Sequence, residues 1–376
     1  MGVTESVTGT QARNLLVGLV STPSPSGEES AVATRLVDFF EAHGREVWLD
    51  EVGNVRAPGD IGVLLTSHMD TVPGDIPVRI EADSTYGTGE CGEVLWGRGS
   101  VDATGALAAM AVAAVRTGTS FAGVVREETD SGGARHLIET SEEPAALING
   151  EPSGWDAITL GYRGYLPATY QVETESAHTS RPEPNAIQHA TAWWQAVESV
   201  VETEFSSPDS VFEAVTATPV QFDGGLTADG HAVEATVNAE FRVPPDVAVA
   251  DLKATVVEET AIGSIEWGPE TPPVMASPRT PVARAFRAAI RAEGETPRML
   301  RKTGTADVNL YAEAWDCPTA TYGPGNSALD HAPDERLSLA EFDRSIAVLT
   351  RVGADLADGS AAAGDQCTAV DPGGVS

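Results

Sequence analysis

Seven residues of this chain have side chains that could bind a metal ion or transfer a proton, and most of them come in close pairs or directly after apolar runs. Imidazole and carboxylate groups are ligands that suit Zn²⁺, and Co²⁺ or Mn²⁺ also bind them. A carboxylate that is not a ligand can act beside the metal as a general acid or base. The seven residues are His68, Asp70, Asp102, Glu127, Glu128, Glu151 and His331.

Buried strands are predicted to position most of these groups. The apolar run 61–67 precedes His68 and is typical of a parallel strand, and residues i and i+2 of an extended segment point the same way, so His68 and Asp70 should face one cleft. Glu127 and Glu128 follow a second apolar run, and Glu151 follows a third. Open α/β sheets build their sites at such strand ends.

Asp102 immediately precedes an Ala-rich segment that is predicted to be a helix over 103–116. Each acid taken alone is explained equally well as a solvated loop residue or a helix cap, since this chain is rich in acids. The ordered set of His-x-Asp, Asp, Glu-Glu, Glu and His is much harder to explain as coincidence. We therefore interpret the set as one site.

The order of these residues resembles that of the M20 family of co-catalytic metallo-hydrolases, over residues 10–355. The resemblance implies that His68, Asp102 and Glu151 hold one divalent metal ion. Asp102, Glu128 and His331 would hold a second, with Asp102 bridging the two, and Zn²⁺ is the expected metal, with Co²⁺ as an alternative. Glu127 would be the general base, and Asp70 would orient the imidazole of His68.

The physical chemistry of such a site agrees with those roles. A bridging carboxylate can hold two cations about 3.5–4 Å apart, and the pKa of a water molecule between them falls towards neutrality. A nearby carboxylate that is not a ligand must then take a proton and pass it to the leaving amine. The expected reaction is hydrolysis of a linear amide.

The middle of the chain changes character and is predicted to be a separate, inserted domain. The resemblance implies an α/β fold with a phosphorylase/hydrolase-like zinc-exopeptidase catalytic domain and an inserted α+β ferredoxin-like lid and dimerisation domain. We expect catalytic segments at 1–160 and 275–357, the insert at 161–274, and a disordered Gly-, Ala- and Asp-rich tail at 358–376. Within the insert a β-α-β-β-α-β order is predicted, at 165–174, 185–204, 214–222, 233–243, 246–260 and 264–267.

Several residues resemble the family's substrate contacts. His178, in the segment 176–187, would reach the active site of the partner subunit of a homodimer and polarise the scissile carbonyl, although a turn histidine is the simpler reading. Arg242 would bind a substrate carboxylate, and a surface salt bridge is its ordinary alternative. The loop with Lys302, Gly304 and Thr305 would offer further donors. His231 stands near the place where many family members have an asparagine, and no role is assigned to it.

Segments 302–310 and 322–335 resemble one branch of the family. Members of that branch release lysine or ornithine from LysW, a small acidic amino-group carrier protein of lysine and arginine biosynthesis. The amino acid is attached through its α-amino group to the side-chain carboxylate of the carrier's C-terminal glutamate. The alternatives are an N-acetylornithine deacetylase, a succinyl-diaminopimelate desuccinylase, a di-zinc peptidase, or a non-catalytic M20-like binding protein, which would normally have lost a ligand.

The charge balance is extreme. The chain has 56 acidic and 23 basic residues, a net charge of −33 and only two lysines, Lys253 and Lys302. This composition indicates an enzyme of a high-salt cytoplasm, in a halophile, because strong salt screens carboxylate self-repulsion. It excludes nucleic-acid binding, which needs basic patches, and the 41% hydrophobic content argues against a disordered acidic protein.

The remaining observations concern the cellular compartment. No apolar run approaches the length of a membrane span, and no signal-peptide pattern opens the chain, so a cytoplasmic protein is expected. The wide spacing of Cys91, Cys317 and Cys367 favours ordinary thiols over disulfides or a cysteine zinc site.

Overall fold

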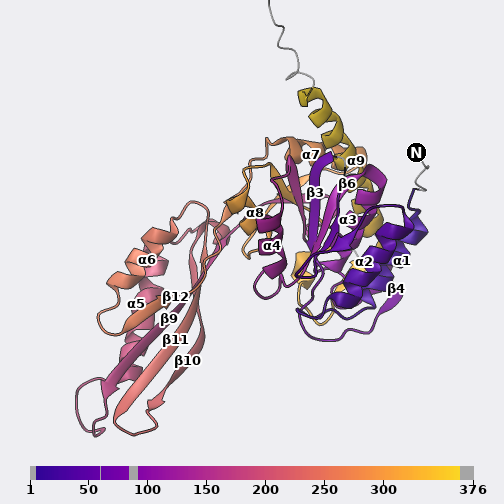
Figure 1. Ribbon diagram of the computed structural model, residues 1–376. Helices are drawn as coiled ribbons and strands as arrows, with labels where there is room; N and C mark the ends of the chain where they lie inside the picture. Colours follow the sequence, from indigo (N-terminus) through magenta and orange to yellow (C-terminus); the bar gives the residue numbers. More distant parts are fainter. Residues whose placement is uncertain (1–5, 60, 84–91, 365–376) are drawn as a thin grey trace, which may run out of the picture. The chain divides into compact units, whose positions relative to one another are not determined.

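The computed structural model describes residues 6–59, 61–83 and 92–364 (Figure 1). The chain divides into two compact units. The α/β unit comprises residues 1–160, 276–300 and 306–376, and the inserted unit comprises 161–275 and 301–305. The short segment 301–305 differs from the expected division, because it packs with the insert and not with the catalytic segments around it.

A mixed sheet forms the centre of the α/β unit. In the described part of the chain it has nine strands, in the order β1-β2-β6-β3-β7-β15-β8-β13, with β14 also paired to β8. The neighbours β6, β3, β7 and β15 run parallel to one another. The strands are β1 (Trp48–Leu49), β2 (Val55–Ala57), β3 (Ile61–His68), β6 (Thr119–Val124), β7 (Ala146–Gly150), β8 (Ala157–Tyr162), β13 (Val274–Met275), β14 (Arg298–Lys302) and β15 (Thr319–Thr321).

Helices and a small antiparallel sheet complete this unit. The small sheet has the order β16-β5-β4. Helix α3 is buried from Thr104 to Val115 and packs against β3, α1 and α9, and its small alanine side chains permit this close packing. These elements are α1 (Gly9–Val20), α2 (Ser30–Ala42), α3 (Thr104–Thr117), α4 (Gly132–Thr140), α7 (Pro281–Ala292), α8 (Val308–Ala314), α9 (Leu339–Gly364), the 3₁₀ turn η2 (Ser327–Leu329), β4 (Arg79–Asp83), β5 (Gly92–Trp96) and β16 (Arg336–Ser338).

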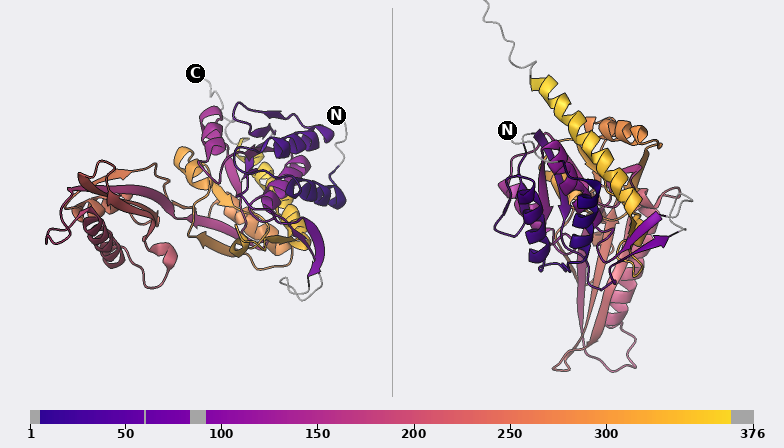
Figure 2. Two further views of the ribbon diagram at one scale, coloured as in Figure 1. Left: turned by 90° about the horizontal axis from the view of Figure 1, so that it is seen from below. Right: turned by 90° about the vertical axis from the view of Figure 1, so that its right-hand side faces the viewer.

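The inserted unit has the predicted β-α-β-β-α-β order. Its antiparallel sheet runs β10-β11-β9-β12, and α5 packs against β9, β10 and β11 (Figures 1 and 2). Burial alternates along β9 and β11, since only one face of the sheet meets the helices, and Tyr170 stacks on Trp193 in that core. The elements are β9 (Gly164–Glu175), α5 (Ala186–Glu204), η1 (Val211–Glu213), β10 (Thr216–Leu226), β11 (Ala232–Val243), α6 (Val249–Glu258) and β12 (Ser264–Trp267). The predicted fold class, an α/β domain with an α+β insert, is confirmed.

The last helix extends into the segment for which a disordered tail was expected. The tail expected to be disordered from residue 358 begins in the structure as the last turns of α9, which ends at Gly364 (Figure 2, right). Residues 365–376 lie outside the described residues. Cys317 is a free, half-buried thiol, whereas Cys91 and Cys367 are outside the described part. None of the helices in the described ranges is long and apolar enough to cross a membrane.

Candidate metal centre

Three parallel strand ends bring the predicted site together. In the sheet register His68 lies beside Val124, and Ser67 lies beside Gly150. The segments that follow β6 and β7, with Glu127, Glu128 and Glu151, therefore leave the sheet at the same edge as His68. The spacing of apolar runs in the sequence was sufficient to predict this edge.

Two groups of neighbours meet at Asp102. Nε2 of His68 lies 3.2 Å from Oδ1 of Asp102 and 3.8 Å from Oε1 of Glu151. Nε2 of His331 lies 3.2 Å from Oδ2 of Asp102 and 3.1 Å from the Glu128 carboxylate. One oxygen of Asp102 thus faces each histidine, which is the arrangement that a bridging carboxylate requires.

The chemistry of these side chains fits divalent metal ions. Ligand atoms of His68, Asp102 and Glu128 all lie within 4.8 Å of one another. Burial, together with repulsion from Asp102 and Asp70, raises the pKa of Glu128, although His68 and His331 oppose this shift. Carboxylates packed this closely repel one another, and a cation between them relieves that repulsion. The set has the imidazole and carboxylate groups that Zn²⁺ or Co²⁺ binds.

Asp70 contacts more of the site than its expected role as partner of His68 suggests. The nearest acceptor for Nδ1 of His68 is the main-chain oxygen of Asp70 at 2.9 Å, whereas the Asp70 carboxylate is 3.5 Å away. That carboxylate accepts the backbone N–H groups of Glu127 and Glu128, both at 3.0 Å, and the hydroxyl of Ser26 at 2.7 Å. Burial alone would raise the pKa of Asp70, but these hydrogen bonds and His68 lower it. Asp70 therefore positions the acid pair as well as the histidine.

Glu127 has the environment of a general base. Burial, together with repulsion from Glu151, Asp307 and Glu128, raises its pKa well above the ordinary value, although His68 opposes this shift. A carboxylate with a raised pKa is a stronger base, and general bases work best when their pKa is near the working pH. The structure thus separates the environments of two adjacent glutamates, since Glu128 lies against His331.

Glu335 supports the candidate site, and sequence reasoning did not single it out. Its side chain is fully buried, and its carboxylate accepts backbone N–H groups of Gly99 (3.1 Å), Val101 (2.8 Å) and Asp102 (3.1 Å), and an N–H of Arg98 (2.9 Å). It fixes the loop that carries Asp102, the candidate bridging aspartate. Its position four residues after His331 was the available signal, but only the structure shows the contact.

Replacing Glu335 is expected to loosen the metal centre. In Glu335→Gln the new amide N–H₂ would face the N–H donors of Gly99 and Arg98. We expect metal affinity to fall by about 10- to 100-fold, as for other groups that orient ligands. Competition with a chromogenic chelator measures this affinity. The neighbouring exposed Asp334→Asn is the control, and equal affinity in both variants would contradict the role of Glu335.

Asp307 is a second residue that was not singled out. It precedes α8, is almost fully buried, and burial raises its pKa to about 6. Among the described residues Oδ1 of Asp307 has no hydrogen-bond partner. Its negative charge contributes to the raised pKa of Glu127.

His331 has the left-handed backbone conformation, with φ of 61°, which is uncommon for residues other than glycine and is often found at functional sites.

The predicted substrate contacts lie in the inserted unit. A guanidinium N–H of Arg242 donates to Oγ1 of Thr305 at 3.1 Å, so two of these predicted residues are neighbours. Lys302 lies 6.0 Å from the centre of the Tyr162 ring, and Gly304 is exposed. His178 is exposed, with Nδ1 2.8 Å from Oγ of Ser180. Their roles stay predictions.

His231 has a structural role in the inserted unit. Its carbonyl oxygen accepts the N–H of Ser176, and its own backbone N–H donates to Asp229. These bonds close the end of the β9–β11 pair.

A two-metal hydrolase is the class that the α/β sheet, the strand-end ligands and the paired donor groups define. The family model for Peptidase family M20/M25/M40 matches residues 64–355. The chain belongs to this family, and the predicted membership and hydrolase activity are confirmed.

Curated relatives share most of the chain. A [LysW]-lysine hydrolase of Deinococcus radiodurans is 41% identical over 359 residues, covering 90% of this chain and 95% of that protein. A putative [LysW]-lysine/[LysW]-ornithine hydrolase of Thermococcus kodakarensis is 36% identical, and the match covers 89% of this chain and 89% of that protein.

Solved structures share the fold. A tripeptidase from Staphylococcus aureus matches with a TM-score of 0.75 and 20% identity, covering 94% of this chain and all of that one. YXEP of Bacillus subtilis, described as a dinuclear metal-binding peptidase from the M20 family, matches with a TM-score of 0.64 and 13% identity, covering 93% of this chain and 98% of that one.

Proposed function

We propose that this chain hydrolyses the amide that links lysine or ornithine to the C-terminal glutamate side chain of the carrier protein LysW. The observation that carries the proposal is the 41% identity, over 90% of the chain, to a [LysW]-lysine hydrolase. The side chains at the site are consistent with it, since both groups of candidate metal ligands and the candidate base are present. An N-acetylornithine deacetylase, a succinyl-diaminopimelate desuccinylase and a di-zinc peptidase are the competing activities.

We assign the metal ligands as predicted. His68, Asp102 and Glu151 would hold one ion, and Asp102, Glu128 and His331 the other, with Zn²⁺ as the proposed metal. When bound, such ions supply Lewis acidity, which polarises an amide carbonyl and acidifies water. Asp70 holds His68 and the backbone of the acid pair in place.

Protein side chains would perform the proton transfers and hold the substrate. Glu127 takes a proton from the attacking water and delivers it to the leaving α-amine. Arg242, with the neighbouring Gly304 and Thr305, binds the α-carboxylate of the leaving amino acid, and Lys302 adds positive charge beside this loop. His178, from the partner subunit of a dimer, stabilises the oxyanion.

The test uses the loaded carrier. LysW with lysine or ornithine on its terminal glutamate is incubated with metal-loaded enzyme, and mass spectrometry follows the carrier. Loss of one lysine or ornithine mass is expected, with a kcat/KM above those for N-acetylornithine and N-succinyl-diaminopimelate. If the loaded carrier stays intact while an acetylated or succinylated amino acid is hydrolysed rapidly, the carrier assignment is wrong.

The dimer is proposed to form through the inserted unit. Strand β10 is the edge of its sheet, and it exposes Val220, Phe222 and Leu226. An exposed edge strand with apolar side chains can pair with another chain. Sedimentation velocity should give a dimer, and Phe222→Asp should shift the protein towards monomer.

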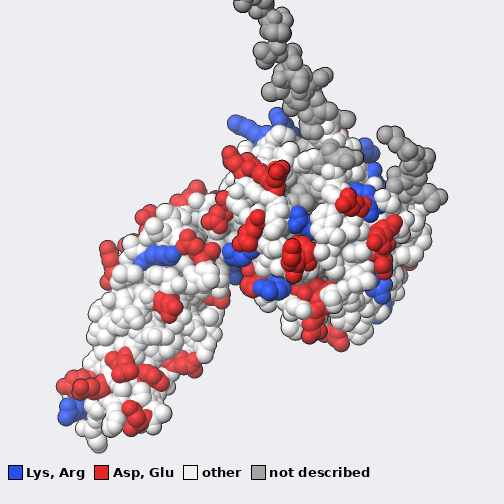
Figure 3. Space-filling model, in the orientation of Figure 1, with Lys and Arg blue, Asp and Glu red and all other residues white. Residues whose placement is uncertain are grey.

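We also propose that the protein functions in a salt-rich cytoplasm. Figure 3 shows acidic side chains spread over the visible surface of both units, with fewer basic ones. At about 1 M salt the Debye length falls to about 3 Å, so this repulsion is screened. The same salt concentration would also screen the repulsion between this protein and an acidic carrier protein.

The salt dependence of folding follows from the net charge of −33. The melting temperature followed by circular dichroism is expected to rise steeply between low salt and about 1 M or more, because carboxylate repulsion destabilises the compact state. Sucrose at equal water activity is the control for non-ionic effects. A melt that is unchanged between low and high salt would refute the proposal.

A further inference from the structure

A cavity of about 500 Å³ lies in the α/β unit, and two of its lining segments lie close in the sequence to candidate metal ligands. One wall begins at Ser153, two residues after Glu151. Another is the segment 325–329, which follows β15 and ends two residues before His331. Because β15 runs parallel to β7, the segments that follow these two strands begin at the same edge of the sheet. The candidate metal ligands lie at this edge. Two lining segments of the cavity are therefore joined directly to the candidate ligands Glu151 and His331. The cavity is large enough for an amino acid.

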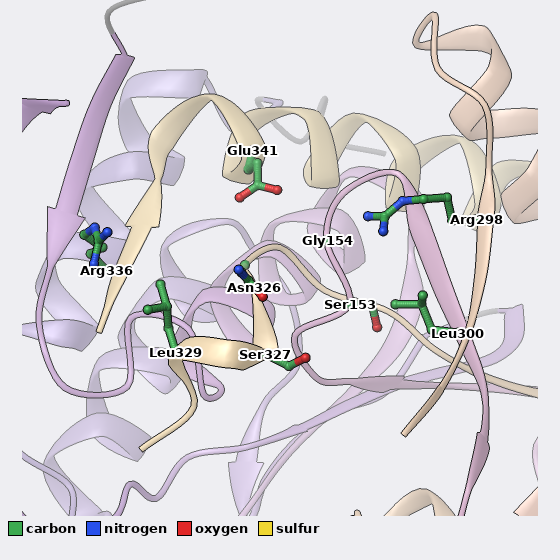
Figure 4. A pocket seen from close by; sticks show the side chains of 10 residues that line it. Ser153, Gly154, Arg298, Leu300, Asn326, Ser327, Leu329, Arg336 and Glu341 are labelled. Carbon is green, nitrogen blue, oxygen red and sulfur yellow. The ribbon is translucent and has the colours of Figure 1, made fainter. Parts of the chain in front are cut away.

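The first turn of α9 places Glu341 on this cavity (Figure 4). The backbone N–H of Trp155 donates to its carboxylate, but no donor among the described residues reaches Oε2. Burial and the nearby Asp156 raise the pKa of Glu341 to about 7. A buried carboxylate with a hydrogen bond to only one of its oxygens has an unfavourable free energy of desolvation. A cation beside it would offset that free energy.

The arginines on the same cavity are already paired. Arg298 donates to both oxygens of Asp156, at 2.8 and 2.7 Å. Arg336 donates to Asp334 at 2.9 Å. These two pairs are each neutral, and Glu341 is the lining carboxylate, among the described residues, that forms no ion pair, although the charge of Arg344 nearby lowers its pKa. A carboxylate without an ion-pair partner favours a cationic occupant over an anionic one.

Apolar side chains complete the lining. Leu329 and Leu300 lie on opposite sides of the cavity, and the Glu341 carboxylate points from α9 towards the loop that carries Asn326 (Figure 4). A lysine side chain has the matching pattern, since its methylene stem can lie along apolar surface while its ammonium group reaches a polar partner.

We infer that this cavity binds the side chain of the leaving amino acid, with its methylene groups along Leu329 and Leu300 and its terminal ammonium at Glu341. The inference rests on the proposed function, because it names which part of the substrate this part of the site recognises. Glu341 is then a specificity-determining residue that selects lysine and ornithine over amino acids with uncharged side chains.

The test compares L-lysine with L-norleucine, which has the same length of carbon chain up to the amine but lacks the charge. Isothermal titration calorimetry measures binding of each free amino acid to the metal-loaded, full-length protein. Wild type is expected to prefer lysine. Glu341→Gln, which keeps an oxygen for the N–H of Trp155, should weaken lysine binding about 10- to 100-fold and leave norleucine binding unchanged.

Two further variants make the result specific. Glu139→Gln removes an exposed glutamate of α4 and should leave both affinities at the wild-type value. Ser327→Trp fills the cavity without changing its charge and should weaken the binding of both ligands. Melting temperatures of all variants establish that they are folded.

The outcomes separate this inference from the proposed function. If Glu341→Gln keeps the wild-type preference for lysine, or if Ser327→Trp binds both amino acids normally, the inference is overturned, even when the loaded carrier is still cleaved. Wild type that binds lysine no better than norleucine also overturns it. A lysine preference that depends on Glu341 supports it independently of any hydrolysis of the carrier.

Discussion

Glu127→Gln is expected to lower kcat by about 10²- to 10⁴-fold while the protein keeps its full metal content. The reason is the difference between two adjacent glutamates. Burial and neighbouring carboxylates raise the pKa of Glu127 well above its ordinary value, whereas the Glu128 carboxylate lies 3.1 Å from His331 within the candidate ligand set. An amide in place of Glu127 removes the base and preserves the volume of the side chain.

Glu128→Gln is the matched comparison. The same change one residue later should weaken metal binding, because a neutral amide is a poorer ligand than a carboxylate. Inductively coupled plasma mass spectrometry of both purified variants, with kinetics on the same samples, distinguishes the roles. Equal loss of metal from the two proteins would show that the division between base and ligand is wrong.

Exhaustive chelation is expected to abolish hydrolysis, and added Zn²⁺ or Co²⁺ should restore it. Asp102, Glu128 and Glu151 lie with two histidines at one edge of the sheet, and no basic side chain is needed there if cations balance the carboxylates. Restoring metal should also raise the melting temperature, because a ligand that binds the folded state stabilises it.

The control for chelation is the chelator already saturated with Zn²⁺, which should leave the rate unchanged. Metal analysis must show that the treated protein is free of metal. Full activity in such a sample would refute the metal assignment, and an unchanged melting temperature on metal addition would argue against a site at these residues.

Local patterns in the sequence predicted the elements that carry the site. The apolar runs before His68, Glu127 and Glu151 are strands β3, β6 and β7, and the Ala-rich segment after Asp102 is α3. In the insert, the strand expected at 264–267 is β12 with the same bounds. These features are predictable because hydrophobic periodicity and strand length are local properties of the chain.

Long-range contacts could not be predicted in the same way. Glu335 binds backbone groups more than 230 residues away, and Glu341 meets Trp155, which lies 186 residues earlier in the chain. No spacing rule connects such positions. The extent of α9 is a different case, since a Gly-containing segment can continue a helix when alanines and the preceding turns favour it.

The position of β15 has a consequence for synthesis of the protein on the ribosome. This strand, at 319–321, lies between β7 and β8, which come some 160 residues earlier in the chain, and Glu335 and His331 come later still. A nascent chain that has emerged only as far as α7 has a gap in its central sheet and an unsupported Asp102 loop. Because non-local pairings form late, the candidate metal centre can be assembled only when translation is nearly complete. Truncated translation products of this gene should therefore be unable to take metal from the cell.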